Sequence, residues 1–449
     1  MKGAAVLATV LAGVALLAAP GAGAQDTTGA PQGVRIGLTY APGVKPGVVV
    51  MPVDRSPGDS VRRILERDFD YSDRLTVISL DSTTLAGLRP QRGRFNYPLF
   101  GRLGAAAIVV TTPIPTGYRV TVHDVAAARV LRADDFTITP ARNSPEWRMA
   151  IHGVADEIER WLLGRRGIAQ TRILFSRRGR LHMIDSDGAN MRQVASVGDA
   201  LSPSWHPNGN IIAYASLSPG GTRVVLQDLR TGSRRVLRAT ASSLNITPTF
   251  TPDGRYIVYA TGRQSGTELV ATPMNDLSSA RLVTVGRGAD NTSPTYSPDG
   301  RRLAFTSGRA GQPEVYVADA DGTNVQLMTE FTYGGTSYRA SPAWSPDGRS
   351  IAYQASAGGF QLMLLSLRDR AVRQLTGEAS NEDPSWAPDG RHVVFTSTRT
   401  GAHQLWVMDV ETGRMRQLTR ASGARLSEWS PILAPQQELR ASNGASSND

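Results

Sequence analysis

The chain has 449 residues with 49 Lys and Arg against 39 Asp and Glu, a formal net charge of +10, and no cysteine. The lack of cysteine excludes disulfides, thiolate catalysis and a cysteine-linked lipid. The positive charge is carried by scattered arginines, and no basic run is longer than a pair such as Arg165-Arg166 or Arg177-Arg178. We therefore expect a solvated surface and no nucleic-acid partner.

The first 24 residues are typical of a secretory signal peptide. Lys2 precedes an apolar run from Ala4 to Ala19, and Ala22-Gly23-Ala24 fits a cleavage site. The alternative, an N-terminal membrane anchor, is less favoured because the run is shorter than the roughly 20 apolar residues that a span requires. We expect export and a mature chain that begins at Gln25.

Residues 25–167 are predicted to form an α/β domain. Apolar patterns predict two helices, one over Ser60 to Phe69 and a longer one that begins at Ser144-Pro145-Glu146, where serine is the N-cap and proline takes the first helical position. The segment Gly164 to Gly167 is the expected hinge to the next domain. The strands are predicted at Val48–Val53, Leu75–Leu80, Ala105–Thr111, Tyr118–Val125 and Val130–Ile138.

A repeated phrase dominates residues 168–433. The segment ASPAWSPDGRSIAYQA begins at residue 340, and related segments begin at residues 201, 246, 292 and 382. The turn glycines are spaced 45, 46, 48 and 42 residues apart, which matches a four-stranded propeller blade of roughly 40 to 45 residues. Each unit carries four β runs, so each predicts one antiparallel blade. The glycines are Gly209, Gly254, Gly300, Gly348 and Gly390.

The two ends of the repeat region are incomplete in complementary ways. Residues 172–194 supply three strands without the preceding phrase, whereas Leu426 to Pro431 supplies the first strand alone. Joining them predicts a sixth blade that closes the ring non-covalently. The fold class is therefore an N-terminal α/β domain followed by a six-bladed β-propeller, and residues 434–449 are an expected disordered tail.

The most conspicuous residues of the phrase are predicted to be structural. Proline, aspartate and glycine suit a tight turn between the first two strands, and the aromatic before them fills the gap between blades. Repetition of the aspartate argues against acid/base catalysis, which uses one or two carboxylates in unlike environments. The aspartates are Asp253, Asp299, Asp347 and Asp389, and the aromatics are Trp205, Phe250, Tyr296, Trp344 and Trp386.

The residues that start each innermost strand vary from blade to blade. They lie on the face opposite the turns, together with polar, glycine-bearing loops, so this mouth of the channel is a candidate binding face. The alternative is an ordinary solvated rim. The varying residues are Ser202, Thr247, Ser293, Ser341 and Asp383, with Leu426 in the split blade.

Motifs for nucleophilic, zinc-dependent or nucleotide chemistry are absent from the sequence, and the six histidines show no metal-ligand spacing. We expect no catalytic residue, cofactor or metal.

The order of these parts resembles the TolB family, periplasmic propeller proteins of the Tol-Pal system. The resemblance rests on the S-P-x-W-S-P-D-G units, on Val34-Arg35-Ile36-Gly37-Leu38-Thr39, on Gly47 to Pro52, and on the final Trp429-Ser430-Pro431. It implies a monomeric, non-enzymatic periplasmic adaptor that supports outer-membrane integrity and envelope constriction at cell division. Its partners would be the peptidoglycan-associated lipoprotein Pal and the inner-membrane protein TolA.

The resemblance also implies where the partners bind. TolA would engage the strand Val34 to Thr39, within Gln25 to Tyr40. Two other functions stay open: a propeller related to peptidases, and a propeller that binds another peptide or a glycan. Only about 20 residues follow the last blade, too few for a hydrolase domain of ordinary size. The positions expected to contact Pal are Ser202, Ile246, Thr247, Thr292, Ser293, Ala340, Ser341, Glu382, Asp383 and Leu426.

Overall fold

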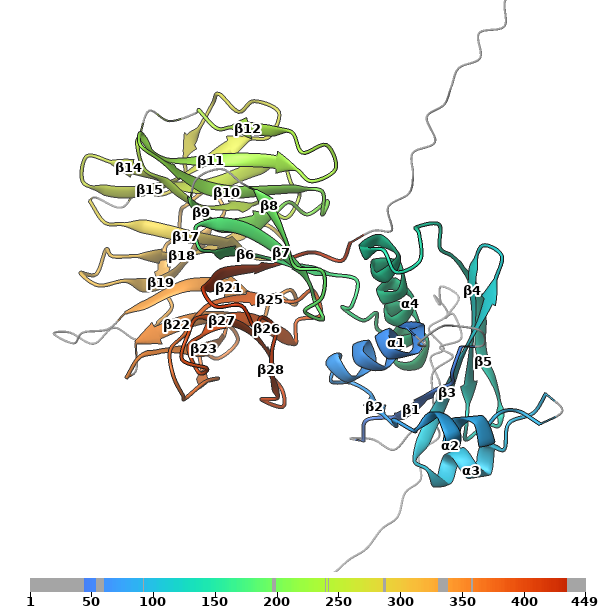
Figure 1. Ribbon diagram of the computed structural model, residues 1–449. Coiled ribbons are helices and arrows are strands. Elements are labelled where there is room, and N and C mark those ends of the chain that lie inside the picture. Colours follow the sequence, from blue (N-terminus) through green and yellow to red (C-terminus); the bar gives the residue numbers. More distant parts are fainter. Residues whose placement is uncertain are drawn as a thin grey trace, which may run out of the picture. The chain divides into compact units, whose positions relative to one another are not determined.

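The computed structural model describes residues 44–433 except 54–59, 92, 196–198, 239, 241, 286–287, 330–337 and 357 (Figure 1). The expected signal peptide, the strand Val34 to Thr39 and the C-terminal tail lie outside the described residues. Within the described part, no helix is long and apolar enough to cross a membrane.

The N-terminal domain is built on a five-stranded sheet in the order β2-β1-β3-β4-β5. Strand β1 pairs in parallel with β2 and β3, whereas β3, β4 and β5 are successive antiparallel neighbours. The strands are β1 (Gly47–Val50), β2 (Thr76–Val77), β3 (Ala105–Ile114), β4 (Gly117–Asp124) and β5 (Arg129–Thr137).

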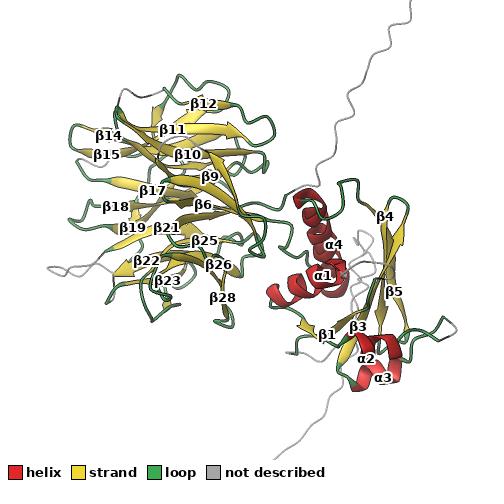
Figure 2. Ribbon diagram, in the orientation of Figure 1, coloured by secondary structure: helices red, strands yellow, loops and turns green. Residues whose placement is uncertain are grey.

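Helices cover both faces of this sheet, because alternate residues of its central strands point to opposite sides. Val48 and Val50 join the core beneath α1 (Ser60–Tyr71) and α4 (Pro145–Leu163). Val49 instead joins the core formed with α2 (Ser82–Gly87) and α3 (Tyr97–Arg102). All the helices in the described part of the chain belong to this domain (Figure 2).

The long helix α4 begins as the sequence predicts. The Ser144 hydroxyl accepts a hydrogen bond from the Trp147 backbone N–H at 3.1 Å, and Pro145 is the first helical residue. Gly164 ends the helix with φ of 71°, a left-handed conformation that glycine adopts without strain. The helix buries the whole predicted apolar face, which comprises Trp147, Ile151, Val154, Ile158, Trp161 and Leu162.

Two local predictions were incomplete. The strand expected over Leu75 to Leu80 pairs with β1 over two residues only, because Asp81 then caps α2 and draws the chain away from the sheet. The short helices α2 and α3 were not predicted, since each has only six residues and too little apolar periodicity to stand out.

The remaining strands form six four-stranded antiparallel blades, as predicted. Blade 1 has β9 (Asp199–Trp205), β10 (Ile211–Ser218), β11 (Gly221–Asp228) and β12 (Arg234–Val236), and blade 2 has β13 (Asn245–Phe250), β14 (Tyr256–Arg263), β15 (Gly266–Pro273) and β16 (Arg281–Leu282). Blade 3 has β17 (Asn291–Tyr296), β18 (Arg302–Ser307), β19 (Glu314–Asp319) and β20 (Gln326–Leu327), and blade 4 has β21 (Arg339–Trp344), β22 (Ser350–Ser356), β23 (Phe360–Ser366) and β24 (Val372–Gln374). Blade 5 has β25 (Asn381–Trp386), β26 (His392–Ser397), β27 (Gln404–Asp409) and β28 (Met415–Gln417).

Blade 6 combines the two ends of the repeat region. Strand β29 (Ala424–Trp429) is its innermost strand and pairs with β6 (Arg172–Arg177), which is followed by β7 (Arg180–Asp185) and β8 (Arg192–Ala195). The red C-terminal strand accordingly runs beside the green β6 in Figure 1. The indole N–H of Trp429 donates to the Thr171 hydroxyl at 2.8 Å, which ties the end of the ring to its start.

The aromatic of each innermost strand packs between blades, as predicted. Trp205 lies with Leu174 and Met183 of blade 6, and Trp429 lies with Val394 and Val407 of blade 5. Because every blade uses the same position in this way, the ring is held by apolar contact between neighbouring sheets.

We expect Trp429→Ala to weaken the closure of the ring. Removing this buried indole should lower the free energy of unfolding by about 3–5 kcal/mol, since a cavity opens between blades 5 and 6. The control Trp406→Ala removes a half-buried indole from β27 and should cost about 1–2 kcal/mol. Urea unfolding measures both, and equal losses would contradict this account of closure.

Candidate functional site

A β-bulge interrupts the innermost strand of every blade at the same place. In blade 2, Ile246 pairs with Ala260 and Thr249 pairs with Val258, so Thr247 and Pro248 together lie opposite the single residue Tyr259. The same register shift recurs in the other five blades. Bulges concentrate beside functional sites because they redirect side chains. The residues opposite the bulges are all aromatic and buried, namely Phe175, Tyr214, Tyr259, Phe305, Tyr353 and Phe395.

The first residue of each bulge has a left-handed backbone conformation. This conformation is unfavourable for residues other than glycine, and five of the six residues also precede a proline, which disfavours it further. These residues are the strand-start positions singled out from the sequence: Ser202 (φ 45°), Thr247 (48°), Ser293 (51°), Ser341 (52°), Asp383 (54°) and Leu426 (54°).

Hydrogen bonds between blades and strands hold these strained residues in place. The backbone N–H of Ser293 donates to the Thr247 hydroxyl of the preceding blade at 3.1 Å. The backbone N–H of Ser341 donates to Thr306 at 3.1 Å, and that of Asp383 donates to the Gln354 side chain at 2.9 Å. Strain that is supported repeatedly in this way is typical of functional positions.

The six residues surround a central cavity of about 290 Å³. The lining consists mainly of serine, threonine and proline, and its charged members are Asp383 and Glu428. The described lining residues include no histidine, lysine or arginine. A serine nucleophile would therefore have no histidine or lysine base beside it here, whereas the hydroxyls and carboxylates could bind polar or cationic groups of a partner.

Both cavity carboxyls have altered acidity. Burial raises the pKa of Asp383 to about 6, and the neighbouring Glu382 charge adds to the effect. Burial also raises the pKa of Glu428 to about 7, although a hydrogen bond from the Ser385 hydroxyl opposes the shift. Both carboxyls therefore change charge closer to neutral pH than ordinary carboxyls do.

The other predicted contact positions lie one residue outside the cavity lining. Ile246, Thr292 and Glu382 are half-buried, and Glu382 forms an ion pair with Arg425 at 3.6 Å. Ala340 is only 4% exposed, so its side chain offers little surface to a partner. Their positions leave the left-handed residues as the part of the predicted site that the structure brings together.

A second group of polar residues lies at the turns on the opposite side of blades 5 and 6. Asp389, in the repeated turn of blade 5, accepts hydrogen bonds from the backbone of Arg391 and His392, as expected of a turn residue. Its carboxylate also lies 3.1 Å from the Arg74 guanidinium of the N-terminal domain. The structural interpretation of Asp389 was therefore incomplete, and sequence reasoning missed its contact with Arg74.

The sequence did contain a signal for this difference. In blades 2, 3 and 4 a serine or threonine hydroxyl two residues earlier donates to the turn aspartate, as Ser345 does to Asp347. In blade 5 Ala387 takes that position, and a histidine follows the turn at position 392. The second carboxylate oxygen of Asp389, which these hydroxyls do not contact in the other turns, lies against His392 and Arg74.

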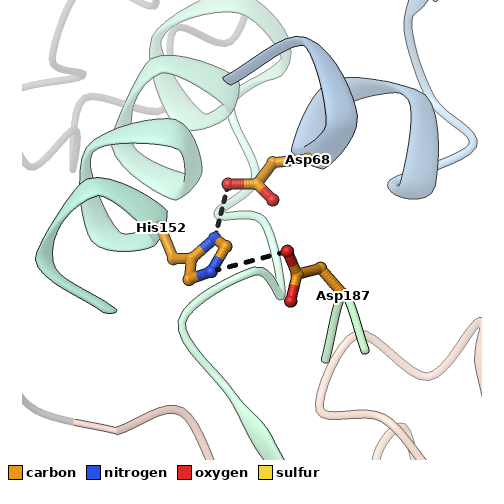
Figure 3. A group of neighbouring side chains, drawn as sticks. All are labelled: Asp68, His152 and Asp187. Carbon is orange, nitrogen blue, oxygen red and sulfur yellow. Dashed lines mark hydrogen bonds and ion pairs between the residues drawn. The ribbon is translucent and has the colours of Figure 1, made fainter. Parts of the chain in front are cut away.

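Two groups of histidine and carboxylate have the separations that a metal ion requires. These are Asp68, His152 and Asp187, and Asp73, His392 and Asp409, with one ligand atom from each residue within 4.8 Å of the others. In the first group, Asp68 and Asp187 face opposite ring nitrogens of His152 (Figure 3). One ion cannot bind both nitrogens of one ring, and arginines already neutralise Asp187. We therefore interpret this group as an ion-pair cluster. The second group is interpreted in the same way because Arg414 pairs with Asp73 and Arg391 with Asp409.

We expect Ser341→Gly to raise the free energy of unfolding by about 0.5–1 kcal/mol, because glycine adopts the left-handed conformation without strain. Ser341→Val should lower it by about 1–2 kcal/mol, since a β-branched residue tolerates that conformation least. The same changes at Ala343, two residues along the strand, should have the reverse order, and an unchanged order would exclude strain at Ser341. Urea unfolding provides the measurement.

Comparison with known proteins identifies the propeller. The family model described as TolB beta propeller domain matches residues 160–433. Curated proteins named Tol-Pal system protein TolB are similar over part of the chain. The one from Chromobacterium violaceum is 28% identical over 39% of this chain and 42% of its own length, and one from Haemophilus influenzae is 29% identical over 43% and 48%. The chain thus spans about half the length of the curated relatives it matches.

A solved structure extends the similarity to both domains. The crystal structure of TolB from Acinetobacter baumannii matches with a TM-score of 0.73 and 25% identity, covering 88% of this chain and 98% of that one. A chain of the crystal structure of the nidogen/laminin complex, with a TM-score of 0.50 and 11% identity over 59% of this chain and 100% of its own length, shares only the fold. The family model covers more than half of this chain, and the chain therefore belongs to the TolB β-propeller family.

Proposed function

We propose that the chain is a non-enzymatic periplasmic adaptor of the Tol-Pal system. It would bind a Pal-like, peptidoglycan-associated lipoprotein at the propeller mouth and a TolA-like inner-membrane protein through Val34 to Thr39, and so support outer-membrane integrity and constriction at division. The observation that carries the proposal is the ring of six strained, left-handed residues around one cavity in a member of the TolB family.

The chemistry of the mouth supports binding to another protein. Six bulges present hydroxyl, carboxylate and leucine side chains from a rigid scaffold, so a partner loop can meet fixed hydrogen-bond groups without ordering them first. The six equivalent positions are not all alike, since three are serine and the others are Thr247, Asp383 and Leu426, and the packing of the ring does not require this variation. A peptidase-related or glycan-binding propeller is the alternative, and the cavity lining provides no histidine to favour the peptidase.

We expect the double substitution Thr292→Arg and Ser293→Arg to abolish capture of the Pal-like protein in a pull-down from periplasmic extract. Two long cations would obstruct one side of the cavity mouth. The matched control changes Thr323 and Gln326 to arginine. These exposed residues belong to the same blade but lie at the turn between β19 and β20, on the side opposite the mouth. Leu426→Arg provides a second mouth variant in another blade.

Circular dichroism first confirms that each variant is folded. Retained capture by folded variants at both positions would contradict the proposed Pal site. Failure of the unmodified protein to capture a Pal-like lipoprotein would contradict the wider proposal.

We also expect deletion of residues 25–40 to remove binding to the TolA-like protein while leaving capture at the mouth intact, because the deleted segment precedes every described strand. Binding to the purified periplasmic domain of the TolA-like protein can be measured by calorimetry. Unchanged affinity would remove the assignment of Val34 to Thr39.

A further inference from the structure

Two buried histidines each lie between a carboxylate of the N-terminal domain and a carboxylate of the propeller. His152 belongs to α4 and lies between Asp68 of α1 and Asp187 of the turn after β7 (Figure 3). His392 begins β26 and lies between Asp389 of the propeller and Asp73, which follows α1. Both imidazoles are fully buried. The same arrangement thus occurs twice, with the histidine supplied once by each domain.

The geometry around His152 favours a doubly protonated ring. Its Nδ1 lies 2.7 Å from an Asp68 carboxylate oxygen. Its Nε2 has no hydrogen-bond partner but points at the Asp187 carboxylate 4.0 Å away. Arg148 of α4 and Arg67 of α1 contact the same Asp187 oxygen. Asp156, one turn further along α4, adds a nearby carboxyl. An N–H on each side of the ring would face a carboxylate, whereas a neutral ring leaves one carboxylate facing a lone pair.

His392 has two close carboxylate partners. Its Nδ1 lies 2.8 Å from Asp389 and its Nε2 lies 3.3 Å from Asp73. Since a neutral imidazole carries one N–H, it can donate to only one of them. The charged groups packed around this site are Arg74 on Asp389, Arg414 and Lys45 on Asp73, Arg391 with its partners Asp409 and Glu411, Asp70 on Arg414, and Glu159 on Arg74.

The pKa values agree with this geometry. Burial opposes the charged form of both rings, yet the carboxylates outweigh it and raise the pKa of His152 and of His392 above the ordinary range. The bonds and charges of His392 and Arg74 outweigh burial in the other direction and lower the pKa of Asp389 to about 2. The Asp389 carboxylate therefore stays ionised through the pH range in which the histidines titrate, whereas burial raises the pKa of Asp68 despite its bond with His152.

We propose that these two histidines form a proton-controlled latch that joins the N-terminal domain to the propeller. With both rings protonated, each cation binds carboxylates of both domains at once. With both rings neutral, each carboxylate pair loses the imidazolium between its two members. The arginine pairs on Asp187, Asp389 and Asp73 remain, so the contact weakens but is not abolished.

The direction of the pH dependence follows from proton binding. When the contact opens, each ring is exposed to water and returns to its ordinary pKa of about 6.5. Below that pH both states are protonated and the contact has its full strength. As the pH rises through the higher pKa of the closed state, closing requires proton uptake, so the closed state is lost. The latch is therefore closed in mildly acid solution and opens in alkaline solution.

The segment that connects the two domains is held to α4 and can act as a hinge when the latch opens. The Asp156 carboxylate of α4 accepts hydrogen bonds from the backbone of Ala169 at 2.7 Å and Gln170 at 2.9 Å. These bonds hold the start of the propeller against α4 and involve neither histidine. Burial raises the pKa of Asp156 to about 7, so its carboxylate is ionised and these bonds are strongest at the alkaline pH at which the latch opens. Release of the latch would therefore increase the distance between the two domains most for residues that lie far from Asp156.

The absence of cysteine permits a direct measurement of this separation. Cysteines introduced at the exposed residues Ala86 of α2 and Ala371 of the turn after β23 would carry the two dyes for single-molecule energy transfer on the full mature chain. We expect one short-distance population at pH 6, and an open-to-closed ratio at least tenfold higher at pH 8.5. A ratio that does not change over this range would overturn the proposal.

Variants separate the latch from other pH effects. We expect the double variant His152→Gln and His392→Gln to give the same ratio at both pH values, whereas His403→Gln, in the same blade as His392 but half-exposed, should behave as the unmodified chain. A pH response that persists in the folded double variant would contradict the proposal. So would a closed state that EDTA removes, because a bound cation would then hold the domains together.

The unmodified chain also provides a test in case the double variant fails to fold. Proton NMR titration should show His152 and His392 protonated to a pH above the ordinary histidine pKa of about 6.5. If they titrate at or below that value, the latch is excluded, since a neutral ring cannot donate to both carboxylates.

Discussion

The pairing of β29 with β6 is the interaction on which the rest of the structure depends. It joins residues more than 240 positions apart and turns five consecutive blades and one divided blade into a closed ring. An open array would leave the inner sheet edge of blade 6 and an apolar blade face exposed to water. Closure also brings Leu426 and Glu428 into the lining of the cavity, so the mouth is complete only when the C-terminal strand is in place.

The repeated phrase specifies both the packing of the innermost strand and the residue that this strand places at the cavity. Its aromatic residues stabilise the ring, with Trp344 and its equivalents between blades and Tyr353 and its equivalents opposite the bulges. The bulge places one variable residue per blade at the cavity, while the turn six residues later points to the other side. Each blade can therefore vary at the mouth without loss of the packing that holds it.

Much of the fold could be predicted from the sequence, because a 45-residue period and an exact division of the last blade leave few alternatives. Helix α4 was equally clear from Ser144, Pro145 and its apolar face. The six left-handed positions around the cavity could also be predicted, as variable residues at the starts of the innermost strands. Their left-handed backbone was not predicted, because a residue before proline ordinarily favours an extended conformation and five of these precede proline.

The contacts between the domains were harder to predict. His152 and His392 are 240 residues apart, and their partners come from α1, from the segment after α1 and from two turns of the propeller, so no spacing in the sequence connects them. Only tertiary structure shows that Asp389 differs from Asp253, Asp299 and Asp347. The local sign, Ala387 in place of serine or threonine, becomes meaningful once the hydroxyl's role in the other turns is known.

Strand β25 runs between the two sites and sets how they can influence one another. Asp383 stands at its mouth end and Asp389 lies in the turn six residues later, at most about 20 Å away along an extended chain. Salt screens exposed charges beyond a Debye length of about 8 Å at physiological ionic strength, but His392 is buried, so a charge that a partner brings to the mouth is screened much less at this ring. The strand is also the innermost of a packed blade, with Trp386 buried against blade 4, which leaves little room for it to shift alone. A charge at the mouth can therefore act on His392 through the packed interior, whereas a mechanical coupling between the two sites requires the blades to move together.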